Sequence, residues 1–321
     1  MTEKPILSVV TPTLGTFSEY WIEQLLKVRG EVQFIFVYPP GATPQVPDDP
    51  RVKVLISPYK GEVMQRFVGL LNASGEFLIA LDDDDFIHPD VAEMTFKYFQ
   101  RFPESWVLKL FRNNINYLDR ESIEKEWADI PDISQLEIDR KTEDNPYPFQ
   151  RGNYKGLLEI PVAPLDTPSN VSYAIWPFAE RKDMHGLHFE NFNNMVWKTQ
   201  IVQQALPDVS ASMKLLGNIT WLPAWNLDRL LGLFVQAKFY QKDLIIGHAP
   251  PKPEQIRYIE RPANLKQIRF HLSSDALLVK RFPQYGYFWN LFFNLSWDGL
   301  RIVGKMARRR LSKLEPERGE K

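Results

Sequence analysis

The chain has 321 residues, of which 44% are hydrophobic and 25% charged, and its formal net charge is −1. This composition is typical of a globular protein with a substantial core, and so low a net charge excludes a strong overall attraction to nucleic acid. The absence of cysteine excludes disulfides, thiolate metal sites and a cysteine nucleophile. No apolar run reaches the ~20 residues of a membrane span and no signal-peptide pattern opens the chain, so we expect a cytoplasmic protein.

Strands and helices alternate along the first third of the chain. Short apolar runs rich in β-branched residues predict strands at 6–10, 32–38, 52–56, 77–81 and 106–111. Helical periodicity predicts helices after the capping-box pair Thr16 and Glu19, at 62–72 and at 89–102. This alternation predicts an α/β fold with a mainly parallel, doubly wound sheet and helices on both faces. Ligands of such sheets bind beyond the carboxyl ends of the strands.

Four consecutive carboxylates follow the strand at 77–81, namely Asp82, Asp83, Asp84 and Asp85. Like charges this close repel one another unless a cation or hydrogen-bond donors offset them. In an extended segment, Asp82 and Asp84 would share one side and Asp83 and Asp85 the other. Hard cations such as Mg²⁺ or Mn²⁺ are held by one or two carboxylates, with substrate phosphates completing the shell. The pattern therefore favours a metal–diphosphate site over the alternative of turn and helix-capping aspartates, for which one or two would suffice.

The second half of the chain has a weaker pattern. We expect an irregular insertion at 119–170 that either covers the active edge or is a solvated excursion, and an acceptor-side half at 171–284 after a first half at 1–118. A helix is expected at 195–206 and another from Arg229, which would make Asp228 a first-turn acid favoured by the helix dipole. His248 follows a short strand at 244–246, and a lone histidine is more often a packed residue than a ligand.

Three stretches of the first half carry a family resemblance. They are Val9-Val10-Thr11-Pro12-Thr13, then Arg66-Phe67-Val68-Gly69 followed by Ala73-Ser74-Gly75-Glu76-Phe77, and Leu81-Asp82-Asp83-Asp84-Asp85. Their order and spacing over residues 6–90 resemble the family-2 glycosyltransferases of the GT-A fold. Fainter similarities follow at 194–198 and 226–230.

The resemblance implies transfer of a sugar from a nucleotide-sugar to a hydroxyl of a glycan or lipid-linked acceptor, with inversion and with Mn²⁺ or Mg²⁺ as cofactor. By position, Asp82 and Asp84 would hold the metal and the diphosphate, and His248 would be a further metal or diphosphate contact. Asp228 would be the general base, with Glu180 or Glu190 as alternatives. The positions that would contact the nucleotide-sugar are Thr11, Pro12, Thr13, Tyr38, Arg66, Asp82 and Asp83.

The chain departs from the family pattern at the loop that follows the second strand. The family usually has acids there, one of which contacts the nucleobase, whereas this chain has Val37-Tyr38-Pro39-Pro40-Gly41. Tyr38 could instead stack on a base. Phe67 and Leu227 replace a usual Asn and Glu. Two other functions therefore stay open, a non-catalytic binding or scaffold protein of the same fold and a sugar-phosphate nucleotidyltransferase.

The C-terminal segment, residues 285–321, is amphipathic and ends in a basic cluster. Apolar residues at helical spacing lie opposite a polar side that includes Asn290, and Arg308-Arg309-Arg310 with Lys313 form the basic end. Such a helix, over 285–313, is expected either at the inner face of a membrane, beside anionic lipid, or packed on the catalytic domain. No base-stacking module accompanies these cations, so nucleic acid is not an expected partner.

Overall fold

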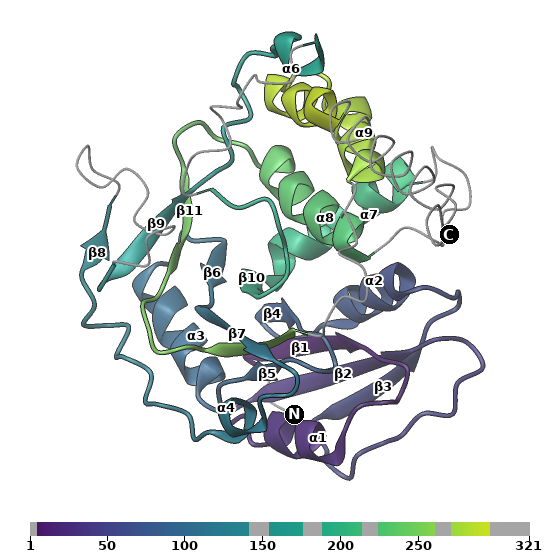
Figure 1. Ribbon diagram of the computed structural model, residues 1–321, viewed down its shortest axis with the longest axis vertical. Coiled ribbons are helices and arrows are strands. Elements are labelled where there is room, and N and C mark those ends of the chain that lie inside the picture. Colours follow the sequence, from purple (N-terminus) through teal and green to yellow (C-terminus); the bar gives the residue numbers. More distant parts are fainter. Residues whose placement is uncertain (1–4, 141–153, 176–187, 214–223, 261–270, 296–321) are drawn as a thin grey trace, which may run out of the picture.

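The computed structural model describes residues 5–140, 154–175, 188–213, 224–260 and 271–295. Their main sheet has nine strands in the order β3-β2-β1-β4-β10-β6-β11-β9-β8 (Figure 1). In chain order these are β1 (Leu7–Pro12), β2 (Val32–Tyr38), β3 (Val52–Ile56), β4 (Phe77–Ala80), β6 (Val107–Lys109), β8 (Ile138–Asp139), β9 (Leu157–Pro161), β10 (Met195–Lys198) and β11 (Ile245–Ala249). A smaller sheet in the described part has the order β5-β12-β7, from Phe86–Ile87, Ile256–Glu260 and Arg112–Asn116.

The first four strands in this order, β3, β2, β1 and β4, form a continuous parallel block. β1 pairs in parallel with both β2 and β4, and β2 pairs in parallel with β3. The carboxyl ends of these strands therefore meet at one edge of the sheet. β10 is antiparallel to both β4 and β6, and it separates the parallel strands β3, β2, β1 and β4 from β6, β11, β9 and β8. The predicted mainly parallel α/β sheet is confirmed.

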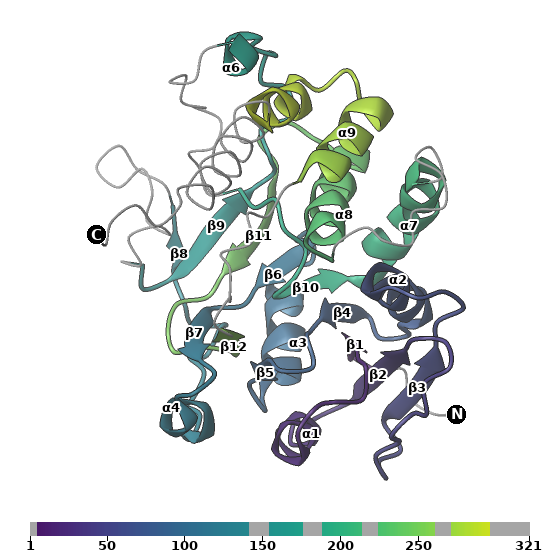
Figure 2. The same ribbon diagram turned by 45° about the vertical axis from the view of Figure 1, so that its right-hand side comes forward.

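Helices cover both faces of the sheet (Figures 1 and 2). They are α1 (Glu19–Leu26), α2 (Glu62–Asn72), α3 (Val91–Arg101), α4 (Arg120–Glu124), α6 (Ser172–Ile175), α7 (Thr199–Met213), α8 (Ala224–Lys238) and α9 (Leu272–Arg281). Successive strand residues point to opposite faces, so Val10 packs in the core with α2, α7 and α8, whereas Val9 packs in the core with α1 and α3. β1, β2 and β4 are buried on both faces, which explains their continuous apolar runs, whereas the edge strand β3 is partly exposed.

The second half of the chain differs from its sequence prediction in three places. Met195–Lys198, expected to be helical, is β10, because Val196 and Trp197 are buried where they pair with β4 and β6. α8 begins at Ala224, so Asp228 lies beyond its first turn. The segment expected to be irregular, 119–170, supplies β8 and β9, and β9 pairs with β11 in the main sheet.

The described part of the C-terminal segment packs against the rest of the protein. Residues 286–295 are helical, and the side chains of Tyr287, Phe288 and Leu291 are buried. Asn290, expected on the polar side, is also buried; its Oδ1 accepts from the Asn170 amide at 2.7 Å and its Nδ2 donates to Pro168 O. The basic cluster at 308–313 lies outside the described residues.

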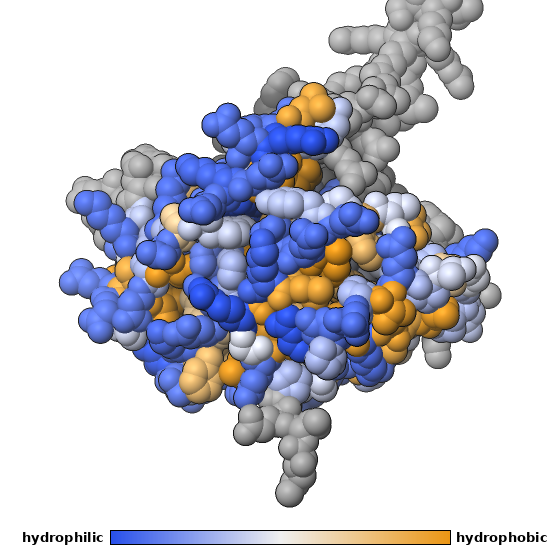
Figure 3. Space-filling view, turned by 90° about the horizontal axis from the view of Figure 1, so that it is seen from below, coloured by the Kyte–Doolittle hydropathy of each residue, from blue (hydrophilic) through white to orange (hydrophobic). Residues whose placement is uncertain are grey.

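The surface seen in Figure 3 is mainly hydrophilic, with separate apolar patches between the polar side chains. Among the helices that the structure describes, none has the length and apolarity needed to cross a membrane.

Candidate functional site

The four aspartates follow β4 in a turn, not in an extended segment. The amide of Asp85 donates to the carbonyl of Asp82 at 3.2 Å, which closes the turn around Asp83 and Asp84. The alternation of sides expected for an extended chain therefore does not apply. Instead, Asp82, Asp83 and Asp85 each have a different partner in the fold, described below.

Asp82 forms an ion pair with Arg66 of α2. The Arg66 side chain is only 4% exposed, and it also donates to Glu62 Oε1 through Nε and Nη2, at 3.0 and 2.7 Å. Its Nη1 donates to Asn193 Oδ1 at 2.9 Å. Burial alone would lower the pKa of Arg66, but the charges of Asp82 and Glu62 raise it above its ordinary value. The guanidinium is therefore a fixed cation at the end of β4.

Asp83 holds the loop that follows β1. Its Oδ2 accepts from Thr13 Oγ1 at 2.7 Å, and Thr13 Oγ1 in turn accepts from the Gly15 amide at 2.9 Å. The side-chain amide of Gln65 donates to the carbonyls of both Thr13 and Val37, at 2.9 and 2.6 Å, and so links the ends of β1 and β2. Three of the predicted nucleotide contacts, Thr11, Pro12 and Thr13, are buried at this edge of the sheet.

Asp85 is only 2% exposed and joins the two sheets. Its Oδ1 accepts from the Ile259 amide of β12 at 3.0 Å, and its carbonyl accepts from Trp21 Nε1 of α1 at 2.7 Å. Burial, followed by the charge of Asp82, raises the pKa of Asp85 to about 8. These two hydrogen bonds fix the end of the turn to β12 and to α1.

Asp82 and Asp84 are the aspartates of this turn that we expect to hold a hard divalent cation. Both are half-buried rather than enclosed, so a ligand can reach them. The described residues contain no group of three or more His, Cys, Asp or Glu side chains arranged to hold a metal. Mg²⁺ and Mn²⁺ do not require one, because one or two carboxylates hold such an ion when substrate phosphates and water supply the other oxygens. The donor set at the end of β4 therefore fits a cation that arrives with a diphosphate.

Asp228 lies on α8, close enough to Arg66 for the charge of each to affect the pKa of the other. Its Oδ1 accepts from the backbone amides of Phe192 and Asn193, at 2.8 and 2.5 Å. Burial raises the pKa of Asp228, while the Asn193 amide and the charge of Arg66 partly offset that rise. Asp82, Arg66, Asn193 and Asp228 thus form one connected set, although they come from four separate parts of the chain.

Glu190, an alternative base, is engaged elsewhere. It accepts a hydrogen bond from Tyr287 Oη and lies 3.1 Å from Arg229 Nη2. Glu180 lies outside the described residues.

His248 is not near the aspartates in the fold. It pairs with Leu108, which pairs with Val196, which pairs with Ile79 of β4. Three strand spacings separate β11 from β4, about 14 Å. The ring is 4% exposed, its Nδ1 lies 2.8 Å from Tyr98 Oη, and burial lowers its pKa to about 4. His248 is a packed histidine between β11 and α3, and it takes no part in the arrangement around Asp82.

The ring of Tyr38 is buried beneath the loop after β1. Its hydroxyl donates to Gln45 O at 2.9 Å, and a Cβ on Gly15 would lie 3.1 Å from Tyr38 Cε1. Gly15 has φ +80°, which a glycine adopts without strain, and its lack of a side chain leaves room for this ring. A base could stack on Tyr38 only if the loop moved.

Comparison with known proteins agrees with this fold. Residues 42–159, which include the aspartate turn, match the family model "Glycosyl transferase family 2". The match and the fold agree with the resemblance of the motifs at 6–90 to family-2 glycosyltransferases of the GT-A fold. No curated protein sequence matches the chain.

Solved structures of S. aureus TarS are similar to it. The fragment 1-349 of TarS in complex with UDP-GlcNAc has 13% sequence identity and a TM-score of 0.54, over 91% of this chain and 73% of that one. The same fragment in complex with UDP has 14% identity and a TM-score of 0.46, over 86% and 70%. At this identity the likeness to the first of these shows a shared fold.

Proposed function

We propose that the protein transfers a sugar from a nucleotide-sugar to an acceptor hydroxyl in a metal-dependent, inverting displacement at the carboxyl end of β4. The observation that supports this most is the set Asp82–Arg66–Asn193–Asp228. It brings a carboxylate suited to metal and diphosphate, a fixed cation and a second carboxylate to one place, between the two halves of the sheet. UDP-sugars are the first donors to test, because the similar TarS fragment was solved with UDP-GlcNAc.

The donor side would act on the leaving group. As the bond between the sugar and the diphosphate breaks, negative charge gathers on the diphosphate. Asp82 and Asp84 would hold a Mn²⁺ or Mg²⁺ ion, and a bound divalent cation neutralises this charge. Arg66 is buried and held by three acceptors, so its positive charge is already in place before the reaction and needs no rearrangement.

Asp228 would act on the acceptor. Two backbone amides fix its Oδ1, which leaves Oδ2 to accept the proton of the attacking hydroxyl. A raised pKa makes the carboxylate a stronger base than an exposed aspartate. A single displacement with this base inverts the anomeric carbon and needs no covalent intermediate on the enzyme.

Replacing the base tests this assignment. In Asp228→Asn the side-chain oxygen can still accept hydrogen bonds from the backbone amides of residues 192 and 193, but the side chain cannot take a proton from the acceptor. We expect transfer and donor hydrolysis to fall by about 10²–10⁴-fold, with the Kd for UDP in the presence of Mn²⁺ changed less than about threefold. Activity close to that of the parent would remove Asp228 from the role of base, and the role would then pass to Glu180 or Glu190.

A membrane surface remains a proposed partner, supported by the basic pattern at 308–313. The packing of 286–295 means that a deletion should spare these residues. A chain ending at residue 299 should keep its fold and lose co-sedimentation with vesicles that contain anionic lipid, whereas it should behave like the parent with neutral vesicles. Equal co-sedimentation of the two chains with anionic vesicles would reject the membrane partner.

A further inference from the structure

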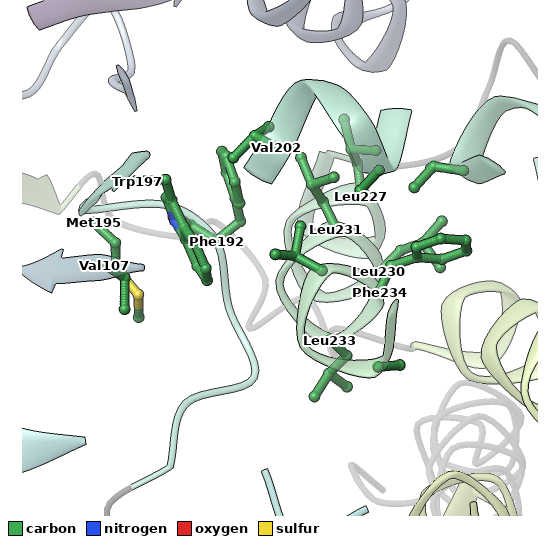
Figure 4. Packing of buried hydrophobic residues seen from close by; sticks show 14 of the residues in the cluster. Val107, Phe192, Met195, Trp197, Val202, Leu227, Leu230, Leu231, Leu233 and Phe234 are labelled. Atoms are coloured by element: carbon green, nitrogen blue, oxygen red, sulfur yellow. The ribbon is translucent and has the colours of Figure 1, made fainter. Parts of the chain in front are cut away.

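The segment that precedes β10, residues 188–193, contacts both α8 and Arg66, and we call it the strap. Most of its contacts tie it to the second half of the chain. Gln236 Nε2 donates to Phe189 O at 2.8 Å, and Trp197 Nε1 donates to Phe192 O at 3.0 Å. The rings of Phe192 and Trp197 stack with an interplanar angle of 8°, and α8 supplies leucines on the other side of Phe192 (Figure 4).

Asn193 is the strap residue that contacts Arg66, the partner of Asp82. Its backbone amide donates to Asp228 Oδ1, while its side-chain Oδ1 accepts from Arg66 Nη1 at 2.9 Å. Arg66 in turn pairs with Asp82. One residue therefore contacts the proposed base through its backbone and, through its side chain, the cation beside the proposed diphosphate site.

The two ends of this connection differ in rigidity. Arg66 is almost fully buried and is bound to two acids as well as to Asn193, so its guanidinium is a fixed point. Asn193 is half-buried and lies in a segment without regular secondary structure. Without the bond to Arg66, residue 193 would keep its amide, but the peptide that carries it would lose its tie to α2. A hydrogen bond to a charged group is among the stronger side-chain contacts in proteins.

We propose that Asn193 is a positioning residue that couples the donor site to the base, by fixing the strap amides that hold Asp228 relative to Arg66 and Asp82. The naming of the two sites rests on the proposed function, whereas the coupling itself rests on the contacts of Asn193. When diphosphate and cation occupy the turn, the position of Arg66 is further restrained, and Asn193 transmits that restraint to the strap. The expected consequence is that donor binding rigidifies the segment around residues 192 and 193.

Hydrogen exchange of the peptide that covers 188–195 measures this directly and needs no catalytic activity. The variants are Asn193→Ala and, as a matched control, Asn191→Ala, since Asn191 is an exposed residue of the same type in the same strap. In Asn193→Ala we expect the amides at 192 and 193 to exchange about tenfold faster than in the parent, as loss of one charge-assisted bond implies. Addition of UDP with Mn²⁺ should slow exchange in the parent and in Asn191→Ala, but much less in Asn193→Ala.

A rescue variant distinguishes a positioning role of Asn193 from a general loss of stability in Asn193→Ala. Asn193→Asp keeps an oxygen that can accept from Arg66, so its exchange should return toward that of the parent. This variant also decides the matter if Asn193→Ala fails to fold. Equal exchange in Asn193→Ala and Asn191→Ala, with or without UDP, would overturn the proposal, as would fast exchange in Asn193→Asp.

Failure of the proposed function gives a different result. If UDP with Mn²⁺ neither binds the parent nor shifts its Tm, the donor assignment is wrong. The exchange difference between Asn193→Ala and Asn191→Ala without ligand still decides whether Asn193 fixes the amides that hold Asp228.

Discussion

Arg66 joins the aspartate turn to the strap. Its three acceptors come from its own helix, from the turn after β4 and from the strap. A lysine could not reproduce this arrangement, because the planar guanidinium offers five donors in fixed directions and an ammonium offers three at one point. Without ligand, the same cation offsets the charge of Asp82, which lies beside two other half-buried aspartates.

Removal of the Arg66 charge should therefore cost more than removal of an exposed arginine. Arg66→Met leaves Glu62 and Asp82 without their cation, and we expect it to lower the free energy of unfolding by about 1–3 kcal/mol in urea denaturation. The matched control is Arg29→Met, since the Arg29 side chain is 71% exposed in its pair with Asp90 and should contribute less than about 1 kcal/mol. Equal losses in the two variants would mean that Arg66 is not a fixed structural cation.

Among the elements, β11 and α3 show how a polar residue can be packed for stability rather than for catalysis. His248 lies between these elements against the ring of Phe102, at 4.3 Å between ring centroids, and its Nδ1 faces Tyr98 Oη. The nearby Arg101 also disfavours a positive charge on the ring. The neutral imidazole suits this environment, which explains why the histidine titrates below its ordinary range.

This packing predicts a specific dependence of stability on pH. The pKa of His248 falls from 6.5 in the unfolded chain to about 4 in the fold, so between these values the unfolded chain takes up a proton that the folded chain does not. Above pH 6.5 the imidazole is neutral in both states, so its titration does not reduce the free energy of unfolding. That free energy falls by about 3 kcal/mol as the pH drops to 4. The difference in unfolding free energy between the parent and His248→Gln, measured by urea denaturation from pH 7.5 to 4.5, should shrink accordingly.

The pH dependence of this difference shows whether the pKa of His248 is lowered in the fold. A difference that stays constant over this pH range would show that the imidazole does not titrate with a lowered pKa. The same variant should leave the response to UDP and Mn²⁺ unchanged, because His248 lies about three strand spacings from β4.

For the whole molecule, sequence reasoning works where function and local pattern coincide. The strand–helix alternation predicts the sheet, and the aspartate run follows directly on β4, because both patterns come from residues close together in the chain. The roles of Gln65 and Asn193 are not predicted from the sequence, because each residue bonds to a partner that is distant in the chain. Gln65 bonds Thr13, 52 residues away, and Arg66 meets Asn193 across 127 residues.

Two further misreadings come from tertiary packing. Asn290 falls on the polar side of an amphipathic pattern, yet it is buried because two backbone groups at 168 and 170 satisfy its amide. Met195–Lys198 reads as helical, yet its pairing between β4 and β6 makes it a strand. In both cases the partners are distant in sequence, so local periodicity gives no sign of them.

We propose that the carboxyl end of β4 binds a nucleotide-sugar with a divalent cation and supports its turnover with Asp228. Release of nucleoside diphosphate from a panel of nucleotide-sugars, measured with Mn²⁺ and with a chelator for the parent, Asp84→Ala and Asp228→Asn, tests this proposal. We expect the parent to turn over at least one donor, and we expect this turnover to be lost with the chelator and in both variants, while Asp228→Asn still binds the donor. Donor binding without turnover by the parent, or turnover that neither Asp84→Ala nor the chelator reduces, would show that the proposal is wrong.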